Sequence, residues 1–285
     1  MAKYLDPKAD VTFKKVFGEH KNLVMSLLNA LLPLDPGKQV ESIEYLPSEL
    51  VPETPLGKNT IVDVRCEETG GRKFIVEMQM EWRANFKQRV LLNASKAYIK
   101  QLPRGNDYNL LQPVYSLNLV NETFEPDMEE YYHYYRLVHY LHSDKVLEGL
   151  HLIFVELPKF TAKNLTEKKM QVLWLRFLTE IGEATKEAPQ DLVDNPHVNE
   201  ALEIVEASAL NDAERAAYDG FWDLVSREAT KEAEMKAAIA ERDAAKERLR
   251  QTICNLKEVG MSVEQVSKVT GLEPTEVETL WGCTK

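Results

Sequence analysis

Three polar residues, Asp63, Glu77 and Gln79, have the types and spacing of a small metal-binding centre. Mg²⁺ binds carboxylate oxygens together with water and substrate phosphate. When bound, such an ion neutralises phosphoryl oxygens and makes a water nucleophilic at neutral pH. Asp63 and Glu77 could hold the ion, and the uncharged amide of Gln79 could orient the attacking water or a phosphate oxygen. The chemistry that these residues predict is phosphodiester cleavage.

Two short extended segments, 60–67 and 72–81, must position these residues. The turn signal Glu68-Thr69-Gly70-Gly71 joins the segments and predicts an antiparallel hairpin. Period-2 alternation puts the three polar residues on one face and an apolar set on the other, namely Val62, Val64, Cys66, Phe74, Val76, Met78 and Met80. Because a carboxylate in apolar company is costly without a cation, this arrangement favours a metal site over the alternative, a solvated strand face.

Helices and strands flank the hairpin in the expected order. Apolar spacing predicts a helix over 10–32, with Asp10 as its N-cap and an interruption near Gly18. A strand is expected over 40–46, a helix over 85–102, a strand over 113–121 and a hairpin over 131–157. The tyrosines of this last segment are expected to pack on the sheet, with a base-stacking platform as the alternative.

A basic strip stands out against a net charge of −11. Residues 1–160 hold 19 basic and 22 acidic side chains, and residues 161–285 hold 16 and 24, so the acidity lies mainly in the tail. No acidic residue interrupts the stretch from Arg83 to Arg104. Phosphate backbones bind clustered Lys and Arg, and the expected contacts are Arg89, Lys96 and Lys100 on the polar side of the 85–102 helix, which also carries Asn93, together with Lys14 of the first helix.

The region after residue 160 is expected to be helical. Residues 212–259 predict one long helix. Positions spaced 3.5 residues apart would form the seam of a coiled-coil dimer, and they are apolar except for Arg242 and Lys246. A dimeric coiled coil and a solvated single helix are therefore both alternatives. Ser262 with Gln265 forms a capping box, and Gly271 separates two short helices. That pair is typical of a helix-turn-helix unit, but its acidic composition favours a helical hairpin used for packing or self-association.

The sequence argues against a membrane protein, a secreted protein and a zinc or histidine metal site. No apolar run is long enough to span a membrane, and residues 1–7 lack the apolar segment of a secretory signal, so a cytoplasmic protein without a membrane partner is expected. The three cysteines form no CxxC pair, which argues against a structural zinc site. The histidines lack the tight spacing of metal ligands.

Five motifs follow one another along the chain: Asp10-x-x-Phe13-Lys14-x-x-Phe17-Gly18, Ile61-Val62-Asp63-Val64, Ile75-Val76-Glu77-Met78-Gln79, the helix from Arg89 to Tyr98, and Glu156-Leu157-Pro158-Lys159-Phe160. This ordered set resembles the PD-(D/E)XK nuclease core, in its variant with glutamine in place of the motif lysine. More specifically, the chain is similar to the bacterial recombination-promoting nuclease/transposase (Rpn) family over about residues 4–160. Val62 stands where the family has a proline.

This resemblance implies an α/β (α+β) fold: a restriction-endonuclease-like αβββαβ core with a mixed central sheet, followed by an all-helical C-terminal region. The expected domains are 1–160, 161–230 and 231–285, with a homodimer formed through the C-terminal helices. It also implies a Mg²⁺-dependent DNA endonuclease, with Asp63 and Glu77 as ligands of Mg²⁺ or another divalent cation, and a role in DNA recombination or mobility. Lys73, Arg65, Arg89 or a second metal would supply the charge that Gln79 lacks. The alternatives are an inactive DNA-binding or assembly protein and a strand-joining transposase.

Overall fold

The computed structural model describes residues 3–50, 60–80, 85–102, 107–161 and 169–281. The described chain divides into two compact units, Met1–Phe221 and Trp222–Lys285, and the sheet belongs to the first. The expected division into domains 1–160, 161–230 and 231–285 stays a prediction. Among the described residues, no helix is both long enough and apolar enough to cross a membrane.

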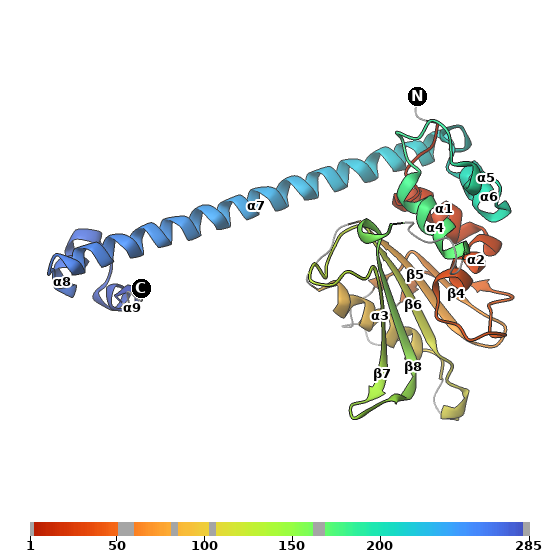
Figure 1. The fold of residues 1–285 in the computed structure, drawn as a ribbon, viewed down its shortest axis with the longest axis horizontal. Coiled ribbons are helices and arrows are strands. Elements are labelled where there is room, and N and C mark those ends of the chain that lie inside the picture. Colours follow the sequence, from red (N-terminus) through yellow and green to blue (C-terminus); the bar gives the residue numbers. More distant parts are fainter. Residues whose placement is uncertain (1–2, 51–59, 81–84, 103–106, 162–168, 282–285) are drawn as a thin grey trace. The chain divides into compact units, whose positions relative to one another are not determined.

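A mixed six-stranded sheet forms the centre of the first unit (Figure 1). Its strand order is β1-β4-β5-β6-β8-β7, from β1 (Glu44–Tyr45), β4 (Val64–Glu67), β5 (Lys73–Gln79), β6 (Val114–Val120), β8 (His142–Glu156) and β7 (Tyr132–His139). Strands β5, β6 and β8 run parallel, and the other neighbours pair antiparallel. Strands β2 (Glu49–Leu50) and β3 (Thr60–Ile61) pair separately. The mixed α/β sheet expected from the sequence is confirmed.

The hairpin of β4 and β5 has the predicted pairing. Val64 lies opposite Val76 and Cys66 opposite Phe74, and all four side chains pack in the main core. Gly71 in the connecting turn has a φ of +88°, a conformation that glycine adopts without steric cost. Turn chemistry and alternation therefore sufficed to predict this part of the sheet.

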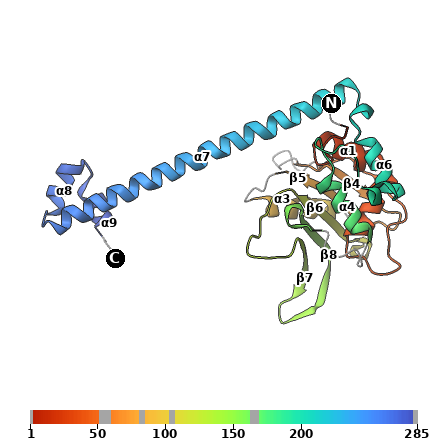
Figure 2. The ribbon, with the colours of Figure 1, turned by 45° about the horizontal axis from the view of Figure 1, so that its top comes forward.

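Helices cover both faces of the sheet (Figure 2). One layer packs on the face of Phe74 and Val76 and consists of α1 (Asp10–Glu19), α2 (Lys21–Leu31), α4 (Lys169–Glu180), α5 (Gln190–Val193) and α6 (Pro196–Ile204). Its centre is aromatic, with the rings of Phe17 and Trp174 5.4 Å apart. Helix α3 (Phe86–Ile99) packs on the other face, where Ala94 and Ala97 contact Ile75.

The first helix differs from its prediction in two ways. The chain bends at His20, whose extended backbone separates α1 from α2, so the expected interruption lies two residues after Gly18. The expectation that Asp10 caps the helix is wrong, because Ala9 occupies the N-cap and Asp10 is the first helical residue. The Asp10 carboxylate instead pairs with Lys14 at 2.6 Å.

Strands β7 and β8 form a hairpin that projects beyond the rest of the sheet (Figure 1). Pairing of β8 with β6 begins only at Leu150, so the first half of β8 pairs with β7 alone. Tyr140 and Leu141 form the exposed end of this hairpin. Its tyrosines divide accordingly: Tyr132 and Tyr134 pack on the main core, while Tyr135 is 41% exposed.

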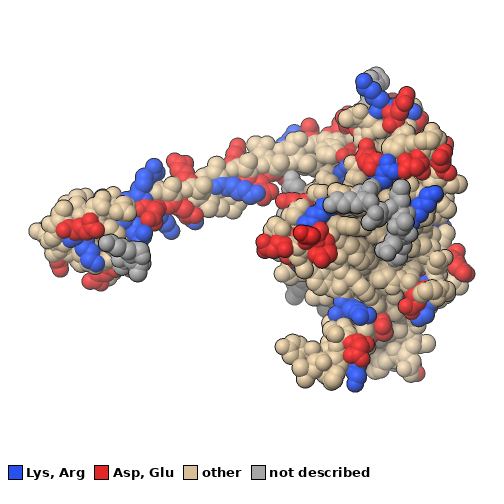
Figure 3. Space-filling view, viewed as in Figure 1, with Lys and Arg blue, Asp and Glu red and all other residues tan. Residues whose placement is uncertain are grey.

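Helix α7 (Asp212–Glu258) leads from the first unit into the second. Acidic and basic side chains both occur along it (Figure 3), and Met235 and Ile239 are exposed. The end of α7 packs with α8 (Val263–Thr270) and α9 (Pro274–Leu280) around Ile253, Val266 and Val277. The predicted capping box of Ser262 and Gln265 is confirmed. The homodimer expected through these helices stays a prediction.

The turn at Gly71 offers a test of the sheet. A Cβ on Gly71 would lie 3.0 Å from Cγ of Gln112, at a φ that L side chains rarely adopt. We expect Gly71→Ala to lower the free energy of unfolding by about 1–2 kcal/mol. Urea unfolding measures the change. Gly182→Ala is the matched control, because no atom lies within 4 Å of its added Cβ; equal effects of the two substitutions would contradict this account of the turn.

Candidate metal centre

Asp63 lies where the chain leaves regular strand geometry, between β3 and β4. Its Oδ2 accepts a hydrogen bond from the backbone N–H of Met78 at 2.7 Å, so the side chain bonds β5 just beyond the last backbone pair, Val64 with Val76. Because the strand is interrupted at this point, the side chain of Val62 packs in the hydrophobic cluster between the sheet and α3. The prediction that Val62 shares a face with Val64 is therefore wrong. The irregularity holds the Asp63 carboxylate against β5.

Glu77 is on β5, beneath α3, and is only 5% exposed. Two residues one helical turn apart on α3 reach its carboxylate. Asn93 donates from Nδ2 to Oε1 at 3.0 Å, and the Arg89 guanidinium lies 3.5 Å from Oε2. Residues four apart share one side of a helix, which explains why both contact the same carboxylate. The face that carries Glu77 is therefore covered rather than solvated.

Asn93 is the residue of this site whose position sequence reasoning missed. Hydrophobic periodicity predicts that Asn93 lies on the solvated side of the helix, yet it is fully buried, while the apolar Leu91 is 48% exposed. The helix is turned so that an amide donor meets the buried Glu77 carboxylate, because such a group requires a hydrogen-bond partner. The four-residue spacing of Asn93 from Arg89 was the signal that could have found it.

Gln79 lies at the end of β5 and accepts a hydrogen bond at Oε1 from the Arg89 guanidinium at 2.5 Å. The other side chains that could supply positive charge lie elsewhere. Lys73 forms an ion pair with Glu67, and Arg65 donates to the backbone oxygen of Pro47 at 3.3 Å. Arg89, with 42% of its side chain exposed, is the candidate that the structure places beside both Glu77 and Gln79.

The other basic residues predicted to contact nucleic acid are Lys14, Lys96 and Lys100. Lys14 connects α1 to the site, since its ammonium is 2.6 Å from Asp10 and 4.0 Å from Asp63. Lys96 is on α3 and Lys100 is its C-cap, about two and three helical turns after Arg89. Their contact with nucleic acid stays a prediction.

Burial dominates the electrostatics of the two acids. It raises the pKa of Asp63 from its ordinary 3.8 to about 7; the Met78 N–H and Lys14 oppose the rise, while Glu77 and Asp10 add to it. Burial likewise raises the pKa of Glu77, against the opposing effect of Asn93 and Arg89. The local donors and cations therefore stabilise the charged forms only in part.

The two carboxylates fit a hard divalent cation. Among the described residues no group of three or more His, Cys, Asp or Glu side chains has metal-binding geometry, but one or two carboxylates completed by waters and phosphate are the usual set for Mg²⁺. A cation beside Asp63 and Glu77 would offset the cost that their raised pKa values report.

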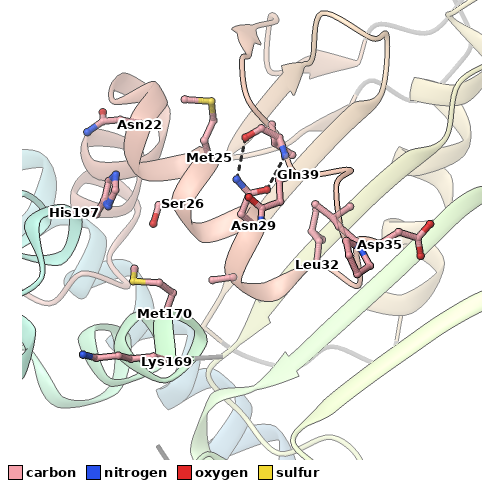
Figure 4. A pocket seen from close by; sticks show the side chains of 14 residues that line it. Asn22, Met25, Ser26, Asn29, Leu32, Asp35, Gln39, Lys169, Met170 and His197 are labelled. Atoms are coloured by element: carbon pink, nitrogen blue, oxygen red, sulfur yellow. Dashed lines mark hydrogen bonds between the residues drawn. The ribbon is translucent and has the colours of Figure 1, made fainter. Parts of the chain in front are cut away.

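Figure 4 shows a cavity, with a volume of about 830 Å³, that neither of these acids lines. It is in the helical layer on the opposite face of the sheet, between α2 and the start of α4, with Met25, Ser26, Lys169 and His197 in its wall. Asn29 fixes one side through reciprocal hydrogen bonds with the backbone of Val40, at 2.9 and 2.7 Å. Neither Asp63 nor Glu77 lines it, so a ligand in this cavity would not meet the two carboxylates.

The raised pKa of Asp63 predicts a pH-dependent loss of stability without metal. Between about pH 4 and pH 7 the unfolded chain has lost this proton while the folded protein keeps it, so stability falls as pH rises through that window. Asp63→Asn keeps an oxygen for the Met78 N–H and removes the charge. In EDTA at about pH 8 we expect the variant to be about 1–3 kcal/mol more stable than wild type.

Urea unfolding across this pH range measures the difference between the two proteins. We expect it to be smallest near pH 4 and to grow up to about pH 7. A difference that does not change with pH would show that Asp63 is not buried in the way described.

One comparison with known proteins identified a family for this chain. A family model described as PD-(D/E)XK nuclease family transposase matches residues 7–224, a span that includes the sheet, α3 and all the residues of the candidate centre. Searches of curated proteins and of solved structures gave no match. Since the family match covers well over half of the chain, this protein belongs to the PD-(D/E)XK nuclease family transposases.

Proposed function

We propose that the protein is a Mg²⁺-dependent DNA endonuclease that hydrolyses phosphodiester bonds at the Asp63/Glu77 centre. The observation that carries the proposal is a pair of neighbouring carboxylates, each with a pKa raised by burial: Glu77 on the covered face of a nuclease-family sheet and Asp63 hydrogen-bonded to the same strand. Carboxylates perturbed in this way are typical of functional sites. The family description supports DNA recombination or mobility as the biological setting.

Asp63 and Glu77 would hold the cation through their oxygens. A bound divalent cation supplies charge for the phosphoryl oxygens and lowers the pKa of a coordinated water. The Met78 N–H and the Asn93 amide fix the two carboxylates, because each donates to one of their oxygens. These donors keep the ligands in place before substrate arrives, which limits reorganisation during the reaction.

Arg89 would supply the positive charge that a lysine supplies elsewhere in the superfamily. Its guanidinium bridges Gln79 and Glu77 and remains partly exposed, so it can bind a phosphate oxygen through a second N–H. Gln79 then acts as a positioning residue, since its oxygen holds the guanidinium at the end of β5. The positive charge of the site would therefore come from Arg89 on α3 rather than from the position of Gln79 on β5.

Cleavage of supercoiled plasmid tests the metal assignment. Wild type should nick the plasmid with Mg²⁺ and lose this activity in EDTA, and Asp63→Ala should lose it under both conditions. Glu67→Gln is the control, because it removes a carboxylate from the other end of β4. Undiminished Mg²⁺-dependent nicking by Asp63→Ala would sink the assignment, and DNA binding without any nicking by wild type would favour the inactive DNA-binding alternative.

The role of Arg89 predicts a loss of kcat. We expect Arg89→Ala to lower the rate constant of the cleavage step, and with it kcat, by about 10²–10³-fold, the usual cost of removing one charge-stabilising donor, and Arg89→Lys to retain part of the activity. Single-turnover cleavage compares these variants with Lys73→Ala, which removes a cation paired elsewhere. A larger loss in Lys73→Ala than in Arg89→Ala would assign the charge to the strand instead.

A further inference from the structure

A small cavity lies on the same side of the sheet as the candidate centre, between α3 and the outer strands. It measures about 260 Å³, and we call it the base pocket; its lining residues are Lys87, Gln88, Leu91, Tyr135, Leu152 and Phe154. Three of these residues come from α3, which also carries Arg89 and Asn93. The centre and the pocket therefore share one positioning element.

Sheet register fixes the separation between the pocket and the carboxylates. Phe154 on β8 pairs with Asn118 on β6, which pairs with Glu77 on β5. Paired residues point to the same face, and neighbouring strands are about 4.8 Å apart, so Phe154 is about 10 Å from Glu77. A stacked strand advances about 3.4 Å per nucleotide, so DNA cut at the centre reaches the pocket within about three nucleotides.

The walls of the pocket suit a flat aromatic ligand. Tyr135 and Phe154 have ring centroids 5.7 Å apart and nearly perpendicular planes, and Leu91 and Leu152 complete the apolar lining. Tyr135 and Leu91 are 41% and 48% exposed and form the accessible apolar surface, whereas Phe154 is only 2% exposed and lies beneath them. Aromatic side chains of this kind stack on unpaired bases regardless of sequence.

Polar groups at the pocket match the rest of a nucleotide. The Lys87 ammonium lies 5.6 Å from the Tyr135 ring centroid and 5.1 Å from that of Phe124, and it pairs with Glu125. A cation placed there can contact the phosphate of a nucleotide whose base is in the pocket. Gln88 adds a side-chain amide to the pocket wall beside Lys87.

We propose that the base pocket binds one unpaired nucleobase of the DNA strand held at Asp63 and Glu77, so that the protein acts on single-stranded DNA in preference to duplex. This inference rests on the proposed function and specifies its substrate. A base in a duplex would first have to leave its stack and its pair, which costs binding energy. The pocket thus selects for a strand that is already unpaired.

Binding of short DNA strands tests the proposal, with Glu77→Gln in every protein so that neither cleavage nor metal enters the measurement. The probes are a labelled oligothymidylate, an all-abasic strand of the same length and charge, and a duplex. The variants are Tyr135→Ala, Tyr135→Phe, which keeps the ring, and Tyr140→Ala as control. Tyr140 is on the same hairpin, 95% exposed, and does not line the pocket.

We expect Tyr135→Ala to weaken oligothymidylate binding about tenfold, within the usual contribution of one stacked base. Its affinity for the abasic strand and the duplex should be unchanged. Tyr135→Phe and Tyr140→Ala should bind all three probes like their Glu77→Gln parent. Fluorescence anisotropy gives these affinities, and circular dichroism checks the fold of each variant.

Either of two results would overturn the proposal: oligothymidylate affinity that Tyr135→Ala leaves unchanged, or an equal loss toward the abasic strand, which would reveal no role for the base. Since this assay requires no cleavage, its failure is distinct from failure of the proposed nuclease activity. Plasmid nicking by wild type would still report on that activity.

Discussion

Two neighbouring carboxylates, Glu77 beneath α3 and Asp63 beside β5, are the constraint on which the rest of this site depends. Glu77 is almost fully buried and Asp63 lies against the neighbouring strand, so each resists ionisation. Charged groups in such surroundings destabilise a fold unless an opposite charge or sufficient hydrogen bonds accompany them. The protein supplies one backbone N–H, one amide and two cations near them, and a divalent ion would complete the balance.

Helix α3 connects this constraint to substrate recognition. One side of the helix brings Arg89 and Asn93 to Glu77, and another lines the base pocket with Lys87 and Leu91. The rotation that buries Asn93 also leaves Leu91 exposed at the pocket. A single helix orientation thus fixes the ligand Glu77, the charge of Arg89 and the surface that a nucleobase would meet.

Turn residues and strand alternation predicted the pairing of the sheet, but short sequence patterns did not predict the placement of Val62 and Asn93. The Gly70-Gly71 turn and the alternation around Phe74 and Val76 determine the β4–β5 hairpin, and the sequence shows both directly. Alternation failed at Val62, where the strand breaks and Asp63 bonds to β5 through its side chain. Helical periodicity failed at Asn93 because a buried Glu77 requires a donor. Both errors arise from tertiary contacts around the carboxylates, which no short window of sequence contains.

Direct titration with Mn²⁺, followed by the electron paramagnetic resonance of the free ion, tests the central claim that Asp63 and Glu77 hold a divalent cation. The wild-type protein at about pH 8 should remove Mn²⁺ from solution and release it when Mg²⁺ is added in excess. Glu77→Gln keeps the size of the side chain and its oxygen for Asn93, and it should bind the ion far more weakly. Wild-type affinity for Mn²⁺ in Glu77→Gln would contradict the account.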